Sequence, residues 1–198
     1  MTAERAAELG RAVTLTLLTP EPAPVAALGP AASKQVADLL EQRGVVFRGG
    51  STVRRISGDT VLASPGDVWV RADRIVGVPL LRGPRLAGLP TDGSGFLIVD
   101  EHGTVPGLDG VFGAGDGTTF PIKQGGVAAQ HAGVAARAIA RRAGADVEVE
   151  AFHPHLRARL VAGSTTLALG DADGGDEKVA APYLAPYLRR LRAEAAVG

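Results

Sequence analysis

The first part of the chain alternates between strand-like and helix-like patterns of apolar positions. Residues 13–18 form an almost unbroken apolar run, which is typical of a parallel strand buried on both faces. Apolar residues then recur at helical spacing from Pro30, whose missing N–H does no harm in a first helical turn, to a helix stop at Gly44. With a further apolar run over 45–47, the pattern predicts a strand–helix–strand unit, preceded by the end of a helix over 3–9.

Short apolar runs separated by turn residues come next. They lie at 53–56, 60–63, 68–70 and 74–78. Gly58-Asp59 and Pro65-Gly66-Asp67 separate some of these runs and favour tight turns. The spacing predicts a β-meander inserted after the strand–helix–strand unit, with antiparallel pairing left open. The stretch 79–90 is rich in glycine and proline and marks a boundary between two lobes.

The second part of the chain contains further short apolar runs and one long helical pattern. Residues 96–99 and 111–114 predict strands, and residues 126–143 predict a helix. Its expected inward-facing stripe consists of Val127, His131, Val134, Ala135, Ala138 and Ile139. A strand over 164–170 and a last helix from residue 181 complete a pattern that predicts an α/β architecture.

The best candidate for chemistry is the run Val111-Phe112-Gly113-Ala114-Gly115-Asp116. A short apolar strand there would deliver Asp116, between glycines, to the mouth of a sheet, where ligands of open α/β folds gather. Glycines let a ligand approach the backbone, and a carboxylate accepts hydrogen bonds from sugar or ribityl hydroxyls. A Gly-Asp-Gly tight turn without any ligand explains the motif equally well.

Lys123, Gln124, Gly125 and Gly126 lie directly before the long predicted helix. A helix N-terminus offers free N–H groups and a partial positive charge, which stabilise negative charge on a ligand such as a reduced flavin ring. Lys123 adds a full positive charge. The alternative is a solvated surface lysine followed by glycines that only lead into the helix. The aspartate motif just upstream favours a ligand site.

Charge and composition narrow the function classes. Lysine plus arginine and aspartate plus glutamate number 21 each, so the net charge is zero and neither nucleic acid nor an anionic membrane is indicated as a partner. The chain has no cysteine, which excludes disulfides, redox-active cysteine pairs and thiolate metal sites within it. It has no signal-like N-terminus and no membrane-spanning run, so we expect a cytoplasmic protein. Peripheral contact of the last helix with a membrane stays open.

Four signatures occur in an order and spacing that resemble the C-terminal half of the pyridine nucleotide–disulfide oxidoreductase superfamily. They are Ala72–Pro79 (ADRIVGVP), Gly95–Asp100 (GFLIVD), Val111–Asp116 (VFGAGD) and Pro121–Gln130 (PIKQGGVAAQ). Two later pieces also match, Phe152–Arg157 (FHPHLR) and Tyr183–Leu188 (YLAPYL), so the resemblance covers nearly the whole chain. Within the superfamily, the sequence is similar to flavoproteins related to sulfide:quinone oxidoreductase and type II NADH dehydrogenase. The implied fold is part of a Rossmann-like flavoprotein with two dinucleotide-binding domains and a β-meander insertion.

The resemblance implies a set of residues that bind the flavin end of FAD. They are Gly115, Asp116, Lys123, Gln124, Gly125, Gly126 and Val127. Asp116 would bind the ribityl chain, the helix start would face the pyrimidine edge of the flavin, and Lys123 and Gln124 would lie near the isoalloxazine ring.

The resemblance also implies a nicotinamide side. Glu21, just past the first predicted strand, lies where an acidic residue can bind an NAD ribose, although an exposed loop charge beside two prolines explains it as well. Val78 and Pro79 would lie where the nicotinamide domain hands over to the flavin domain. The expected parts are an incomplete NAD(P)-binding lobe over 1–80, the C-terminal half of an FAD-binding lobe over 81–150, and an extension over 151–198.

The implied activity is that of an FAD-dependent oxidoreductase. NAD(P)H would reduce FAD, and the electrons would pass to a quinone or another small acceptor. In such chemistry the cofactor reacts and the protein supplies position and electrostatics, so no side chain has to act as a nucleophile or base.

The sequence departs from the family pattern in ways that bear on this activity. It contains no G-x-G-x-x-G turn for a pyrophosphate, and it has His131 and Gly133 where relatives often carry Gln and Asp. The lack of cysteine argues against sulfide oxidation through a persulfide and against disulfide reduction. We therefore expect this chain alone to be inactive and to hold FAD poorly. The alternatives are a truncated non-catalytic remnant, or one subunit of a split flavoenzyme that self-associates or pairs with a chain carrying the N-terminal half.

Overall fold

The structure, a computed structural model, describes residues 2–78 and 80–170 in two compact units. Of these residues, 2–78 and 156–170 form the first unit and 80–155 form the second. No helix in the described ranges is long and apolar enough to cross a bilayer, and no cluster of histidines and carboxylates there could hold a metal ion. The last predicted helix, from residue 181, lies outside the described residues.

The first unit contains the strand–helix–strand arrangement that the apolar pattern predicts. Strands β1 (Leu15–Leu18) and β2 (Val45–Arg48) pair in parallel, and helix α2 (Pro30–Gln42) connects them after the short 3-10 turn η1 (Ala26–Leu28). The helix buries residues at helical spacing, namely Ala32, Val36 and Leu39. Gly44 follows it with a φ of 65°, a left-handed conformation suited to a helix stop. This part of the prediction is confirmed.

One expectation about these strands is wrong. β1 is not buried on both faces, because Thr16 is exposed and the side chain of Leu17 is 45% exposed. The described residues give the β1–β2 pair no third strand, so an apolar run here does not signal two covered faces.

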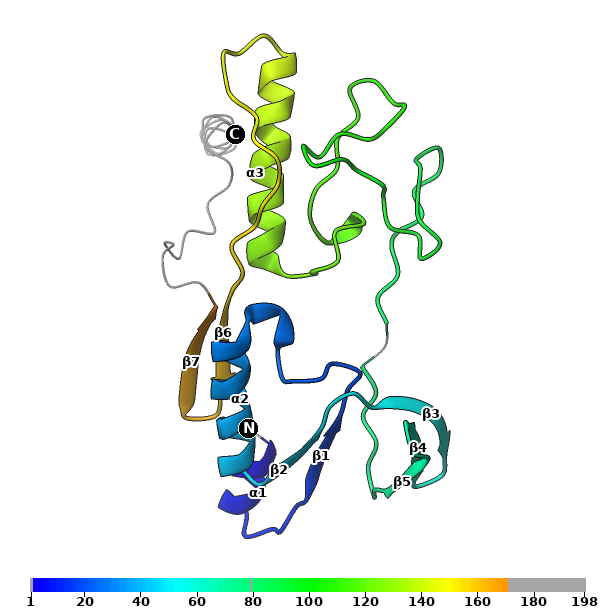
Figure 1. Ribbon diagram of the computed structural model, residues 1–198, viewed down its shortest axis with the longest axis vertical. Helices are drawn as coiled ribbons and strands as arrows, with labels where there is room; N and C mark the ends of the chain where they lie inside the picture. Colours follow the sequence, from blue (N-terminus) through cyan, green and yellow to red (C-terminus); the bar gives the residue numbers. More distant parts are fainter. Residues whose placement is uncertain (1, 79, 171–198) are drawn as a thin grey trace, which may run out of the picture. The chain divides into compact units, whose positions relative to one another are not determined.

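A β-hairpin covers helix α2. Strands β6 (Arg157–Ala162) and β7 (Thr165–Gly170) pair antiparallel, and Figure 1 shows them beside α2. Leu169 of β7 joins Ala32 and Val36 of α2 in a buried apolar cluster. The sequence predicts β7 but not β6, because two arginines interrupt the apolar pattern of β6.

Helix α1 (Thr2–Glu8) is fastened to this unit by a polar cluster. The Glu4 carboxylate accepts hydrogen bonds from the Ser164 backbone N–H at 3.3 Å and the Ser164 hydroxyl at 3.0 Å. It also pairs with the Arg43 guanidinium at 3.1 Å, and Arg43 donates to the Thr165 hydroxyl at 3.0 Å. The hydrogen bond from Ser164, followed by that from Arg43, lowers the pKa of Glu4. The turn of the β6–β7 hairpin is thereby tied to the first helix.

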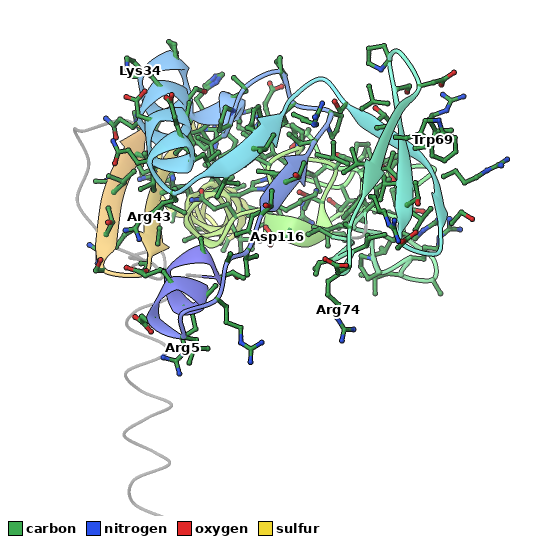
Figure 2. The ribbon with its side chains drawn as sticks, turned by 90° about the horizontal axis from the view of Figure 1, so that it is seen from below. Arg5, Lys34, Arg43, Trp69, Arg74 and Asp116 are labelled. Carbon is green, nitrogen blue, oxygen red and sulfur yellow. The ribbon has the colours of Figure 1, made fainter. Side chains whose placement is uncertain are left out.

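The predicted meander is confirmed, and its strands are antiparallel. β3 (Thr52–Ser57), β4 (Thr60–Ser64) and β5 (Val68–Arg71) form one sheet in that order. Trp69 is 59% exposed, and Figure 2 shows its indole on the outer side of the sheet. The strand predicted over 74–78 is wrong, because the chain forms no strand there.

Loops rather than strands make up much of the second unit. The strands predicted over 96–99 and 111–114 are wrong, since these segments form only isolated bridges. The bridges join Thr91 to Leu97, Leu97 to Thr118, and Thr104 to Phe112. Glycines with positive φ at positions 95, 103, 107, 110 and 115 turn the chain repeatedly, so no ladder extends beyond one bridge.

Helix α3 (Gly125–Arg142) confirms the long helix predicted from the sequence. Its buried residues are Val127, His131, Ala135 and Ala136. Three of these belong to the predicted inward stripe, whereas Ile139, the last member of that stripe, is 48% exposed. A Cβ added at Gly103 would lie 3.0 Å from the Cβ of Ala135, so a loop backbone packs closely on the helix.

The chain then runs back along α3 through residues 144–155, the return segment (Figure 1). The Gln130 side chain binds the His155 main chain twice: its Nε2 donates to the carbonyl at 3.0 Å, and its Oε1 accepts from the N–H at 2.9 Å. The Phe152 N–H donates to the carbonyl of Glu101 at 2.8 Å. These bonds fix the return segment and place the Phe152 ring against the helix.

Candidate functional site

Asp116 lies in a single turn of 3-10 helix, η2 (Gly115–Gly117), and not at the end of a strand. Gly115 has a φ of 77°, and a Cβ added to it would lie 3.2 Å from the Cβ of Ala128 on α3. Because only glycine adopts this conformation without strain, glycine at 115 lets the turn rest directly on the helix.

Both main-chain polar groups of Gly115 are hydrogen-bonded inside the unit. Its N–H donates to Nδ1 of His131 at 3.3 Å, and its carbonyl accepts from the Thr118 hydroxyl at 2.8 Å. His131 is 2% exposed and Thr118 is 1% exposed. The turn that presents Asp116 is therefore anchored by buried side chains.

The Asp116 side chain itself is exposed, and its carboxylate makes no hydrogen bond to the residues that the structure describes. Figure 2 marks its place in the chain. Its negative charge acts on Lys123, whose ammonium it favours. A rigid turn thus carries a carboxylate with its acceptor capacity unused, beside a positive charge.

Lys123 points inward. Its Nζ donates to the carbonyls of Thr118 and Phe120 and lies 4.0 Å from the centroid of the Phe96 ring. Burial lowers the pKa of Lys123, while the charges of Asp116 and Asp92 act in the opposite direction. The freely solvated lysine considered from the sequence is not what the structure contains, because this ammonium ties a loop together.

The start of α3 has no side-chain cap. Gln124 is the N-cap residue in an extended conformation, and among the described residues its side chain makes no capping hydrogen bond to the first turn. The first hydrogen bond of the helix runs from the Ala128 N–H to the Gln124 carbonyl. The N–H groups of residues 125–127 lie before it and have no acceptor within the helix. Gly125 is exposed, and a Cβ added there would meet open space. Val127 is 2% exposed, so its side chain belongs to the core and only its main chain belongs to the helix end.

The main contacts of the site come from an aromatic cluster of His131, Phe120 and Phe152, which the sequence did not predict. The His131 ring stacks on Phe152 with centroids 4.2 Å apart and planes 10° apart, and Phe152 meets Phe120 edge-on at 4.9 Å. Burial, followed by the charge of Lys123, lowers the pKa of His131. A polar residue in the inward stripe of the predicted helix was the available signal, because a buried imidazole needs a hydrogen-bond partner.

Glu21, from the nicotinamide side, lies in the first unit just beyond the carboxyl end of β1. Its side chain is exposed, while its carbonyl accepts from the Gly50 N–H at 2.9 Å. A Cβ added at Gly49 would lie 2.8 Å from the Glu21 carbonyl oxygen, so the loops after β1 and β2 pack closely. The carboxyl ends of these parallel strands meet there, which is the usual edge for a nucleotide.

The other two predicted residues give no contact to interpret. Val78 is 93% exposed, and Pro79 lies outside the described residues. The residues that the structure brings together are those from 115 to 127, all within the second unit.

A family model for pyridine nucleotide-disulphide oxidoreductase matches residues 1–138, well over half of the chain. The chain belongs to this family. The resemblance drawn from the four sequence signatures is confirmed, and so is the Rossmann-like α/β fold class. Pyridine nucleotide-disulphide oxidoreductases depend on a flavin, generally FAD, and on a pyridine nucleotide.

Individual proteins of known sequence or structure match parts of the chain. The ferredoxin reductase component of chlorobenzene dioxygenase from Cupriavidus sp. (strain PS12) is 34% identical over 131 residues, 63% of this chain and 31% of that protein. The sulfide:quinone oxidoreductase structure from Aquifex aeolicus matches with a TM-score of 0.66 and 21% identity, over 81% of this chain and 42% of that one. The ferredoxin reductase structure for the CYP199A2 system from Rhodopseudomonas palustris matches with a TM-score of 0.55 and 20% identity, over 88% and 45%. This chain spans less than half the length of each.

Proposed function

We propose that this chain supplies the flavin-ring end of the FAD site in an oxidoreductase that takes electrons from NAD(P)H. The observation that carries the proposal is the exposed Asp116 carboxylate, which is held on an anchored turn and accepts no hydrogen bond from the described residues. It lies in the part of the chain matched by the family model.

The residues present fit one end of FAD. Asp116 can accept hydrogen bonds from ribityl hydroxyls, and the uncapped start of α3 can donate its N–H groups to an electron-rich ring edge. Glycine at 125 leaves open space beside those N–H groups. The other end does not fit, because the sequence contains no G-x-G-x-x-G turn for the pyrophosphate.

A bound flavin supplies two-electron transfer between NAD(P)H and an acceptor. Within this site, Asp116 orients the ribityl chain and the α3 start stabilises negative charge on the ring. Lys123 acts mainly by holding the loop 118–120, with its charge adding to the positive field of the helix end. Gln124, at the N-cap position, would lie near the bound ring.

On the nicotinamide side, Glu21 is proposed to accept hydrogen bonds from the ribose hydroxyls, because it is exposed at the carboxyl end of β1. Val78 and Pro79 are proposed to belong to the stretch that hands over to the flavin part. The proposed acceptor is a quinone or another small molecule. The absence of cysteine means that this chain contributes no thiol to sulfide oxidation or disulfide reduction.

Titration of the full chain with FAD, followed by flavin fluorescence, tests the proposal and detects binding that would not survive desalting. We expect Asp116→Ala to weaken FAD binding about 10- to 100-fold, which is about 1.4–2.8 kcal/mol and the usual range for a charge-assisted hydrogen bond. Asp146→Ala is the matched control, since Asp146 is an exposed aspartate of the same unit with no predicted role. Because the contacts lie at the ring end, FMN should bind about as well as FAD.

Two results would count against the proposal. Equal FAD affinities for Asp116→Ala and Asp146→Ala would remove the role of Asp116. A strong preference for FAD over FMN would mean that the pyrophosphate and adenosine end supplies the affinity, contrary to the fit of the residues present.

A further inference from the structure

Helix α3 hydrogen-bonds to the turn η2 through His131. The Thr118 hydroxyl also donates to the Gly115 carbonyl, but Thr118 belongs to the same loop as the turn and not to the helix. His131 lies on α3, is 2% exposed, and accepts the Gly115 N–H through Nδ1 at 3.3 Å. Among the described residues, it is therefore the side chain of α3 that hydrogen-bonds to the turn.

The hydrogen bond determines the chemical state of the ring. Nδ1 can accept only with its lone pair, so the imidazole is neutral and carries its proton on Nε2. Protonation would place an N–H on Nδ1 opposite the N–H of Gly115, and the bond would be lost. Stacking on Phe152 holds the ring plane in the orientation that aims Nδ1 at the turn.

The charges around His131 favour the neutral state. Lys123 is the charged neighbour that acts on the ring, and its positive charge opposes protonation, as does burial. Titratable groups on the surrounding loop, turn and return segment include Glu101, Asp116, Asp146, Glu148, Glu150, His153 and His155, which are exposed, and His102, which is half-buried.

We propose that His131 is a positioning residue. The hydrogen bond from the Gly115 N–H to its neutral ring is a latch that holds η2 on α3 and thereby fixes the main chain that presents Asp116. The importance of this latch for a ligand rests on the proposed flavin site, whereas the latch itself is a property of the chain. Acidification that protonates His131 would release the turn.

Hydrogen exchange of the Gly115 amide in the full chain measures directly whether this amide is hydrogen-bonded to His131. In His131→Leu, which removes the acceptor at similar size, we expect the Gly115 amide to exchange about 10- to 100-fold faster, on the scale of an unsatisfied buried donor. His131→Gln restores an acceptor and should recover most of the protection. His153→Leu is the matched control, since His153 is exposed in the return segment, and it should change nothing.

A purely structural role would not depend on protonation, so pH separates the two explanations. In the native chain, we expect acidification to weaken the protection of the Gly115 amide by more than the intrinsic change of its exchange rate. This loss of protection should coincide with protonation of His131, which nitrogen NMR measures. His131→Gln should lack this dependence. Equal protection in native chain and His131→Leu, or a native ring protonated on Nδ1 at neutral pH, would overturn the proposal.

FAD titration of the same variants separates this proposal from the proposed function. If the latch positions Asp116 for flavin, FAD affinity should fall in His131→Leu and recover in His131→Gln. If the native chain binds no FAD while Gly115 responds as expected, the flavin site is refuted and the latch stands. If the native chain binds FAD but exchange of the Gly115 amide does not change in the His131 variants, the latch is refuted and the flavin site stands.

Discussion

Replacing Gly115 with alanine tests how strictly the turn is held against α3. An L-residue in the left-handed conformation costs about 1–2 kcal/mol, and Gly115 has a φ of 77°. The added Cβ would lie 3.2 Å from the Cβ of Ala128, inside the usual carbon–carbon contact of about 3.5–4.0 Å, so the turn must move outward. Its hydrogen bond to His131 is already 3.3 Å long and would be lost, which costs about 0.5–1.5 kcal/mol more.

We therefore expect Gly115→Ala to lower the free energy of unfolding by about 1.5–3.5 kcal/mol, the sum of these two contributions. Urea titration followed by far-ultraviolet circular dichroism measures this change, because α3 is the long helix of the second unit. The only tryptophan of the chain, Trp69, lies in the first unit, so its fluorescence provides a separate probe of that unit.

Gly133→Ala is the matched control. Gly133 lies within α3 and a Cβ added there meets nothing within 4 Å, so alanine should stabilise the helix by about 0.5–1 kcal/mol. If Gly115→Ala were as well tolerated as Gly133→Ala, the close contact of the turn with the helix would be wrong.

Three further predictions use the same urea titration. Lys123→Met should lower the free energy of unfolding by about 1–3 kcal/mol, because two loop carbonyls lose their donor; a loss below about 0.5 kcal/mol would contradict that role. The lowered pKa of His131 means that the unfolded chain binds this proton more tightly, so its contribution to stability is complete above about pH 6.5 and declines as the pH falls through that value. His131→Gln should remove this part of the pH dependence, and an unchanged profile would exclude His131 as its source. Arg71→Ala should leave the urea midpoint nearly unchanged, because the 2.6 Å pair with Asp59 is exposed, and a clearly lower midpoint would show additional packing.

The parts of the fold that could be predicted from the sequence are those in which local periodicity decides the structure. Helix α2 begins at Pro30 and stops at Gly44, and α3 buries residues at helical spacing, so both follow from neighbours in the sequence. The meander follows from turn residues between short apolar runs. The strands expected over 96–99 and 111–114 failed because a strand needs consecutive cross-chain bonds, which a short apolar run cannot ensure.

The candidate site shows the same division. Asp116, Lys123 and the helix start lie close together along the chain, so a turn followed by a helix was enough to predict their proximity. The direction of Lys123 could not be predicted, because it depends on the Phe96 ring from an earlier loop. The anchoring by His131 could not be predicted either, because the ring contacts both Gly115, which precedes α3 in the sequence, and Phe152, which follows it.

The paired hydrogen bonds between Gln130 and residue 155 have a consequence for which substitutions this chain can accept. Gln130 offers one donor and one acceptor to the main chain, just as a neighbouring strand would, so neither bond depends on which side chain stands at 155. In a saturation-mutagenesis library, position 155 should accept most residues for this contact but reject proline, which has no N–H to give. Position 130 should tolerate little beyond glutamine, because few side chains have both groups at the required length. The side chain at position 130 thus determines this contact, whereas position 155 contributes only its main chain and its residue type gives no sign of the contact.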